Sequence, residues 1–169
     1  MATRSTIALE FADGTVQQVY CHWDGYLEHN GKILFENYSN PFILRDLIDL
    51  GDISSLGKIV GTKHPFSPFH VKNSELSDEE NARIEAELKA SYEAAQAAGM
   101  TTFYGRDRGE TGIAAKKFAS FEEYKANHQY EEYEYILRNV NGVATWFVAE
   151  HSDRYVPLEE ALSTIKETV

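Results

Sequence analysis

The sequence predicts one α+β domain over residues 1–169, with an antiparallel sheet built from an N-terminal and a C-terminal hairpin and helices packed on it. Two Xaa-Gly turns, Asp13-Gly14 and Asn141-Gly142, each separate two β-prone runs, and such turns are strong hairpin signals because glycine supplies a positive φ. Segments with helical spacing and capping residues lie between the hairpins. A hydrophobic content of 43% in 169 residues is enough for a single sizeable core.

The N-terminal third should contain two strands and two helices. Residues 5–11 and 15–22 alternate apolar and polar side chains, as strands with one buried face do. Residues 27–38 place apolar side chains on one helical stripe. A second helix should run over 41–50, with Pro41 in its first turn and Gly51 ending it. Residues 52–74, interrupted by glycines and prolines, are predicted to form a loop.

A long acidic helix should follow that loop. Ser77 and Glu80 form a capping box for a helix through Ala98, with Gly99 as its C-cap. Because apolar stripes of helical spacing usually pack on the domain's own sheet, we expect this helix to cover the sheet. The stripe consists of Ile84, Leu88, Tyr92 and Ala95.

The C-terminal third should hold a short strand, a helix, the second hairpin and a final helix. The strand is expected at 101–104, followed by a polar turn, and a capping box at Ser120 and Glu123 predicts a short helix to about Asn127. The hairpin should pair 133–140 with 144–149. A terminal helix should open at Pro157.

Charge is unevenly distributed along the chain. The net charge is −11, from 27 acidic and 16 basic residues. Residues 72–100 carry seven acidic and three basic groups, whereas residues 101–119 carry two acidic and four basic groups. Direct nucleic-acid binding is not expected, because phosphate contacts need clustered Lys and Arg. The acidic excess is either a solvated surface that maintains solubility or a surface for a basic partner.

Other bulk features indicate a cytoplasmic protein. No apolar run approaches the roughly 18 residues needed to cross a bilayer, so no membrane association is expected. The single cysteine suits a reducing compartment. No metal-binding motif is present, and neither a metal nor a cofactor is expected; His64 and His70 are interpreted as loop-packing residues.

The densest group of chemically active side chains is the segment from Tyr20 to Tyr26, which reads Tyr-Cys-His-Trp-Asp-Gly-Tyr. On strand register Tyr20, His22 and Asp24 share one face, where Asp24 could orient His22 for acid–base chemistry. Alternatively, Asp24 makes an Asx-turn or caps the following helix. These residues, with Trp23 and Tyr26, are candidate ligand-binding residues.

Cys21 is a candidate nucleophile that would need a lowered pKa. Its neighbour His22 points to the opposite face of a strand, whereas His128 and His151 could approach only through the fold. The competing interpretation is a small buried hydrophobic side chain. His22, Asp24 and Cys21 are thus candidate catalytic residues for an activity that the motifs do not define.

A second polar cluster spans Tyr104 to Glu110, reading Tyr-Gly-Arg-Asp-Arg-Gly-Glu. Arg106 and Arg108, set between glycines, could bind a phosphate or carboxylate, with Glu110 nearby. The alternative is a surface turn whose arginines pair with Asp107, Glu110 or the acidic helix.

A third cluster, from His128 to Tyr135, is rich in tyrosine and glutamate. Its tyrosines could form a recognition surface, or could pack on the core with their hydroxyls at the rim. Tyr130 and Tyr133, together with Asp78, Glu79 and Glu80 at the start of the long helix, are the candidate partner-binding residues.

Several of these segments also carry a resemblance. The matching segments are 4–7, 20–26, 50–56, 104–110 and 128–133. In them the chain resembles a family of small proteins encoded by bacteriophages, prophages and plasmids, with Leu27 standing where relatives have proline. The resemblance implies a phage-type accessory protein acting in the host cytoplasm, and it carries no assigned chemistry.

Two functions follow as hypotheses. The first is binding of a host regulatory or defence protein, as in counter-defence, through an acidic and tyrosine-rich surface. The alternative is binding or cleavage of a small anionic ligand, such as a nucleotide signal, at a site formed by His22, Asp24, Arg106 and Arg108. Whether the protein is an enzyme is left open by the sequence.

Overall fold

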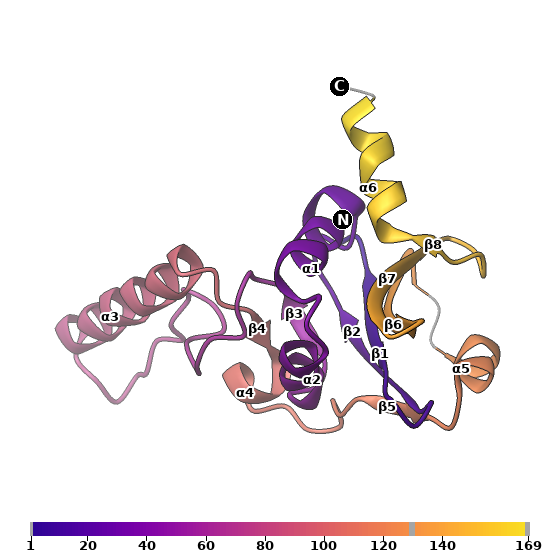
Figure 1. Ribbon diagram of the computed structural model, residues 1–169. Helices are drawn as coiled ribbons and strands as arrows, with labels where there is room; N and C mark the ends of the chain where they lie inside the picture. The colour runs from indigo at the N-terminus through magenta and orange to yellow at the C-terminus, as the bar shows by residue number, and fades with distance from the viewer. Residues whose placement is uncertain (1, 129–130, 168–169) are drawn as a thin grey trace.

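A computed structural model describes residues 2–128 and 131–167 of the chain. Within these residues one sheet of eight strands carries the fold, in the order β4-β3-β2-β1-β6-β7-β8, with β5 pairing to β2 (Figure 1). The α+β prediction is confirmed. The strands are β1 Ser5–Glu10, β2 Val16–Cys21, β3 Ile53–Ser55, β4 Thr102–Phe103, β5 Lys116–Phe118, β6 Tyr133–Val140, β7 Val143–Glu150 and β8 Val156–Pro157.

Both predicted hairpins are present. β1 pairs antiparallel with β2, and Asp13 Oδ1 accepts a 2.9 Å hydrogen bond from the Thr15 amide in the connecting turn. β6 pairs antiparallel with β7. Asn141 and Gly142, at φ 53° and 83°, both take the left-handed conformation that a two-residue hairpin turn requires.

The sheet is mixed rather than antiparallel throughout, which corrects the prediction. β1 runs parallel to β6, with Ser5 opposite Tyr133, and this pairing joins the two hairpins at the centre of the sheet. β2 and β3 also pair in parallel. Within each hairpin the tight turn makes the two strands antiparallel. The direction of β1 relative to β6 depends on the long connection between the hairpins, and no short motif in the sequence specifies it.

Helices pack on both faces of the sheet. The main hydrophobic core lies between the sheet and the helices on one face, and a smaller core lies on the other face. The main core includes Ile7, Val19, Leu137 and Val148 from the strands. It is covered by a π-helical turn η1 Leu27–Gly31, by α1 Lys32–Asn37, by α2 Pro41–Asp49 and by α6 Leu158–Glu167. The second face carries Ala8 and Ile136 under α5 Phe121–Asn127. No helix among the described residues has the length and apolar character needed to cross a membrane.

Most helix ends lie where the capping residues predicted them. The Asn40 side chain accepts from the Phe42 amide at the start of α2, and Ser120 accepts from the Glu123 amide at the start of α5. Ser77 caps the long helix α3 Asp78–Ala97 by accepting from the Glu80 amide. Side-chain oxygens bind the free amides of each first turn, so these boundaries are readable locally.

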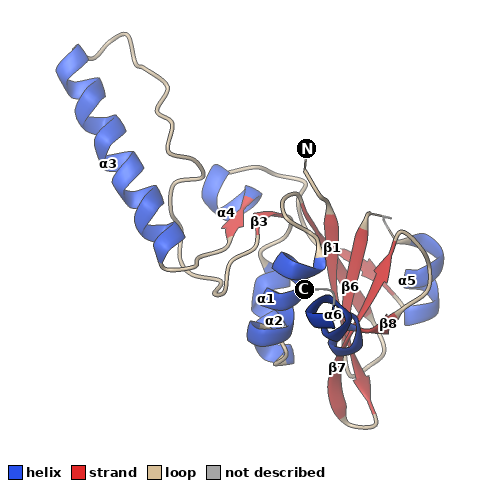
Figure 2. Ribbon diagram, turned by 90° about the horizontal axis from the view of Figure 1, so that it is seen from above, coloured by secondary structure: helices blue, strands red, loops and turns tan. Residues whose placement is uncertain are grey.

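The position of α3 differs from the prediction. Together with the preceding loop it forms an arm, residues 62–98, that projects from the body of the protein (Figures 1 and 2). Of the expected stripe, Ile84, Leu88 and Tyr92 are only half-buried, and Ala95 at the inner end is buried. The stripe is therefore covered incompletely, and the helix does not lie on the sheet.

The sequence-based prediction did not include several short elements. β3, β5 and β8 have three residues or fewer, and the expected turn at 105–110 begins instead as the helix α4 Tyr104–Arg108, which ends at Gly109 with φ 76°. Elements of this length are stabilised by their neighbours in the sheet rather than by their own periodicity.

Candidate functional site

The segment from Tyr20 to Tyr26 continues β2 into a turn around the first strand. The His22 and Trp23 amides donate to the Ile53 and Ser54 carbonyls, so pairing with β3 extends beyond Cys21. Asp24 then adopts a left-handed φ of 56°. Gly25 follows, and a Cβ at this position would lie 2.7 Å from the Cβ of Ser5. The Asp-Gly pair is thus required by the path of the backbone.

Tyr20, rather than Asp24, positions the imidazole of His22. The Tyr20 hydroxyl and His22 Nδ1 are 2.7 Å apart, and both side chains are half-buried. Burial raises the pKa of Tyr20 to about 12, so the hydroxyl keeps its proton at neutral pH. Asp24 is not the cap of the following helix either: the N-cap is Tyr26, with no side-chain cap bond, and the Asp24 carbonyl accepts from the Asn30 amide.

Cys21 is a buried structural residue. Its side chain is inaccessible, and Asn30 Nδ2 lies 3.3 Å from the sulfur. Burial raises the pKa of the thiol to about 11, which is opposite to the shift a nucleophile needs. The interpretation as a small buried hydrophobic side chain is confirmed, and nucleophilic catalysis by this residue is disfavoured.

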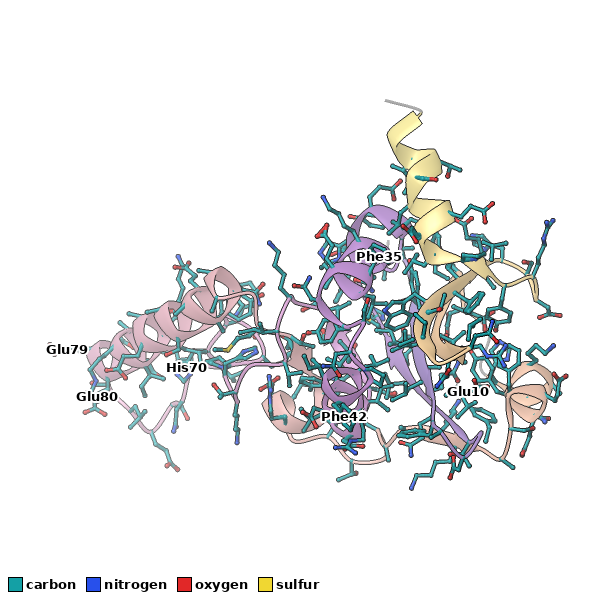
Figure 3. The ribbon with its side chains drawn as sticks, viewed as in Figure 1. Glu10, Phe35, Phe42, His70, Glu79 and Glu80 are labelled. Carbon is teal, nitrogen blue, oxygen red and sulfur yellow. The ribbon has the colours of Figure 1, made fainter. Side chains whose placement is uncertain are left out.

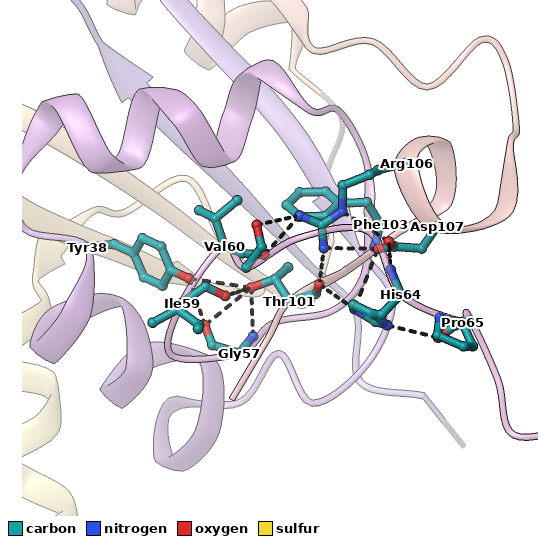
Figure 4. A network of polar contacts seen from close by, with 11 residues as sticks. Tyr38, Gly57, Ile59, Val60, His64, Pro65, Thr101, Phe103, Arg106 and Asp107 are labelled. Atoms are coloured by element: carbon teal, nitrogen blue, oxygen red, sulfur yellow. Dashed lines mark hydrogen bonds and ion pairs between the residues drawn. The ribbon is translucent and has the colours of Figure 1, made fainter. Parts of the chain in front are cut away.

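Arg106 lies inside the protein, at the base of the arm, where Figure 4 shows its contacts. Its guanidinium donates to the carbonyls of Val60, Gly61 and Thr101 and to both oxygens of Asp107, over distances of 2.8–3.2 Å. These five hydrogen bonds match the five N–H groups of an arginine side chain. Arg106 therefore has no donor left for a ligand, and the predicted ligand site loses this residue.

Asp107 completes this base network. Its side chain is fully buried and also accepts from the backbone amides of His64 and Phe103, at 3.1 and 2.8 Å. His64 Nε2 lies 3.1 Å from the Thr101 carbonyl oxygen, and Thr101 Oγ1 bonds to Gly57 and Ile59. The Arg106–Asp107 pair thus joins the segment that enters the arm, residues 60–64, to the segment that returns from it, residues 101–107. In the segment from Tyr104 to Glu110, this arginine therefore has a structural role rather than a ligand-binding one.

Arg108 points to the surface instead. Its guanidinium carbon lies 4.5 Å from the ring centre of Phe66 and 5.0 Å from that of Tyr104, and it forms an ion pair with Glu110. Of the two arginines, only this one is placed where an external anion could reach it.

Residues of the two predicted motifs meet around β3. The Trp23 amide bonds to the Ser54 carbonyl. The Tyr20 amide donates to Asp52 Oδ1 at 2.9 Å, and the Tyr104 amide bonds to the Asp52 carbonyl. Tyr20, His22, Trp23, Tyr104 and Arg108 therefore belong to one region. Tyr26 packs elsewhere, 6.1 Å from the ring of His29.

The predicted partner-binding residues do not form one surface. Asp78, Glu79 and Glu80 lie at the outer tip of the arm, where Figure 3 labels both glutamates. Tyr133 lies in β6, in the body, stacked 6.4 Å from Tyr135. Tyr130 is outside the described residues. The acidic and the tyrosine-rich parts of the prediction are thus separated in space.

The loop histidines pack within the arm, as predicted. His70 Nε2 lies 3.0 Å from Asn81 Oδ1, whose amide group in turn bonds to the Asn73 carbonyl, so the outgoing loop is fastened to the first turns of α3. Among the described residues no group of three or more His, Cys, Asp or Glu side chains is arranged to hold a metal ion.

One buried pair was missed by the sequence. His128 and Glu134 form an ion pair beneath α5 with both side chains essentially inaccessible. His128 Nδ1 lies 2.6 Å from the Tyr124 carbonyl oxygen, and its ring stacks 4.5 Å from that of Tyr124. The signal was available in part, since His128 directly follows a capped helix and Glu134 occupies an inward strand position.

Comparison with protein-family models, with curated proteins and with solved structures gives no match for this chain.

Proposed function

We propose that this protein is a phage-type accessory protein that acts by binding a protein partner, and that the arm of residues 62–98 is its binding element. The observation that carries the proposal is the position of α3. This helix extends from the body, and apart from its inner end it packs on its own preceding loop (Figure 2).

Without a partner, this arm leaves part of its apolar surface exposed to water. Most helical stability in proteins comes from packing an apolar face rather than from helix propensity. Here that face is half-covered by a loop. Within the loop, Phe69 is 79% exposed and Val71 is 88% exposed. Exposed apolar side chains concentrated on one projecting element are typical of an interaction surface.

The base network holds the arm in one direction. Ile59 and Met100 form a β-bridge at the base, and the buried Arg106–Asp107 pair joins the same two strands. A binding element fixed before association loses less conformational entropy on binding, which favours affinity. The network thus gives the second motif of the chain a role in presenting the arm.

The chemistry of the arm favours a basic partner. Asp78, Glu79 and Glu80 occupy the first turn of α3. A hollow of about 360 Å³ beside the loop is lined by Phe69, Pro68, Ala82 and Ala86, with Glu85 and Lys89 also at its wall. An apolar hollow with the Glu85 carboxylate at its wall, next to the acidic first turn of α3, fits a side chain with an aliphatic stem and a positive end. The resemblance to phage-encoded proteins suggests a host protein, and the charge suggests one that itself binds nucleic acid.

The test compares two charge reversals in affinity capture from host lysate. The variant Glu79→Lys with Glu80→Lys alters the arm, and Glu159→Lys with Glu160→Lys is the control, because both pairs are exposed glutamates in the first turn of a helix. We expect the arm variant to lose the partner that the wild type and the control retain. Binding should also weaken as salt is raised, since exposed charges are screened.

Phe69→Ser extends the test to the apolar part of the arm. Its exposed side chain should contribute little to folding, so loss of the same partner would assign the hollow to the interface. A partner retained by both arm variants would contradict the proposal.

A further inference from the structure

A second surface lies at the opposite end of the base network from the arm tip. It is formed by the aromatic cluster, defined here as Tyr20, His22, Trp23, Phe66 and Tyr104 together with Arg108. Trp23 is 44% exposed, although large aromatic side chains usually lie inside a domain. The proposed arm interaction gives this cluster no role.

The guanidinium of Arg108 lies over two rings. The Phe66 and Tyr104 ring centres are 5.6 Å apart, and Arg108 lies within 5.0 Å of both. Its side chain remains 46% exposed, and Glu110 pairs with it. The rings restrain the guanidinium at the surface, and an ordered, exposed guanidinium is a good donor for the oxygens of a phosphate.

Trp23 and His22 offer an aromatic surface beside this cation. Their rings are in edge-to-face contact, with centres 4.7 Å apart, and the hydroxyl of Tyr20 restrains His22 through Nδ1. When the Tyr20 hydroxyl donates to Nδ1, the other ring nitrogen carries a proton and becomes a second donor. A base can stack on exposed aromatic rings of this kind whatever its identity.

We propose that the aromatic cluster binds a nucleotide, with the phosphate on Arg108 and the base against Trp23. The two parts lie on a common support, because the Trp23 amide bonds to the Ser54 carbonyl and the Tyr104 amide bonds to the carbonyl of Asp52, two residues earlier in the same segment. This site differs from the one predicted by the sequence, since Arg106 is withdrawn from it and Tyr104 and Phe66 join it. It requires no reaction, and it shares only Phe66 with the arm.

Substitution of Glu110 should change nucleotide binding in the direction opposite to substitution of Arg108. Its carboxylate is 40% exposed and pairs with Arg108. A phosphate arriving at the same guanidinium meets this negative charge, so Glu110 should oppose binding of an anion. Removing the charge should strengthen nucleotide binding, whereas a purely structural arginine would give no reason for that change.

The experiment is a titration of the protein with the four nucleoside 5′-monophosphates, followed by the indole N–H resonances in an NMR spectrum. The chain has two tryptophans, and Trp146 is buried and serves as an internal reference. Trp23→Phe assigns the two signals. We expect a saturable shift of the Trp23 resonance alone. The matching nucleosides and inorganic phosphate should each bind about tenfold more weakly or worse, because each lacks one of the two contacts.

Three variants complete the test. Arg108→Ala should weaken binding about tenfold or more, and Glu110→Gln should tighten it several-fold. Arg45→Ala is the matched control, since Arg45 is also exposed and stacks on an aromatic ring, that of Phe42, at 5.6 Å; it should leave binding unchanged. The proposal is overturned if no monophosphate shifts Trp23 at millimolar concentration, or if the shift is the same in Arg108→Ala as in the wild type.

Discussion

The hydroxyl of Tyr135 donates a 2.7 Å hydrogen bond to the carbonyl of Gly25, in the interior of the protein. The bond joins the C-terminal hairpin to the turn that follows the N-terminal hairpin. Gly31, one helical turn later, packs against the same tyrosine, with a hypothetical Cβ 3.2 Å from the hydroxyl. One side chain therefore positions both the turn that carries Trp23 and the start of the first helix.

Replacement of this tyrosine should destabilise the fold. Tyr135→Phe leaves the Gly25 carbonyl without its donor, and we expect a loss of about 1–3 kcal/mol in the free energy of unfolding, measured with urea. Tyr133→Phe is the matched control from the same strand, because its ring is half-buried and no hydrogen bond of its hydroxyl is found within the described residues. Equal losses in the two variants would contradict the role assigned to Tyr135.

The base network should depend on Arg106 and not on Arg108. Arg106→Ala leaves the buried carboxylate of Asp107 without its cation, and removal of one partner from a buried pair costs about 3–5 kcal/mol. Arg108→Ala removes an exposed ion pair, which is worth about 1 kcal/mol or less. Urea unfolding measures both, and hydrogen exchange should show the extra loss of protection in residues 57–64 and 99–103 of the Arg106 variant. A stability loss of similar size in both variants would exclude the network as described.

The His128–Glu134 pair should make stability depend on pH. Because Nδ1 of His128 faces a carbonyl, the other nitrogen and the Glu134 carboxyl share one proton. Burial alone would lower the pKa of His128, but the hydrogen bond and charge of Glu134 raise it above 6.5; burial raises the pKa of Glu134 above 4.5. Asp153 strengthens both shifts, and Glu131 also raises the pKa of Glu134.

Both shifts have the same sign for stability. The folded state binds protons more tightly than the unfolded state, so the pair's contribution is full at low pH and declines as pH rises, with the histidine part lost upward from about pH 6.5. Urea unfolding at a series of pH values measures this slope. Glu134→Gln should flatten it above pH 6.5, whereas Glu122→Gln, on the exposed side of α5, should not change it.

A close backbone contact at the base of the arm should reject any side chain at Gly57. A Cβ there would lie 2.3 Å from the Gly99 carbonyl oxygen. Gly57→Ala should therefore cost about 1–3 kcal/mol or more, as overpacking does. At Gly109 a Cβ would meet no neighbouring atom, so Gly109→Ala should lose only about 1–2 kcal/mol of stability, which is what its left-handed φ of 76° costs a non-glycine residue. Thermal unfolding of the two variants compares these costs, and a smaller loss for Gly57→Ala would contradict the close contact.

The thiol of Cys21 should be unreactive in the folded protein. With its side chain buried and its pKa raised to about 11, it should not react with a disulfide reagent at pH 8, and full reaction should appear on addition of denaturant. Rapid labelling of the native protein would contradict this prediction and would revive Cys21 as a nucleophile.

What the sequence could predict was local. Ser77 and Ser120 marked helix starts because a capping side chain bonds within its own first turn, and Asn141-Gly142 marked a hairpin because the turn conformation belongs to those two residues. The apolar spacing of α3 was read correctly as a helix. What covers its stripe is not encoded in that spacing, and a loop can cover it as well as a sheet.

The candidate site was predicted in part for the same reason. Tyr20 and His22 share a strand face, so their contact followed from register. Arg106 and Arg108 looked equivalent because they are two residues apart in a polar segment. A short helix turns one inward onto carbonyls from residues 60, 61 and 101 and the other outward. The carbonyls of residues 60 and 61 lie 46 and 45 residues away along the chain, too far for any motif to reveal them.

The parallel pairing of β1 with β6 sets an order for folding during synthesis. The first hairpin can close as soon as β2 emerges from the ribosome, but β6, the strand that lies beside β1 at the centre of the sheet, begins only at Tyr133 and is translated much later. Until then β1 presents an open edge, and long-range pairing of this kind is slow to form. A nascent chain stalled before β6 should therefore be a substrate for chaperones, whereas the released protein should not.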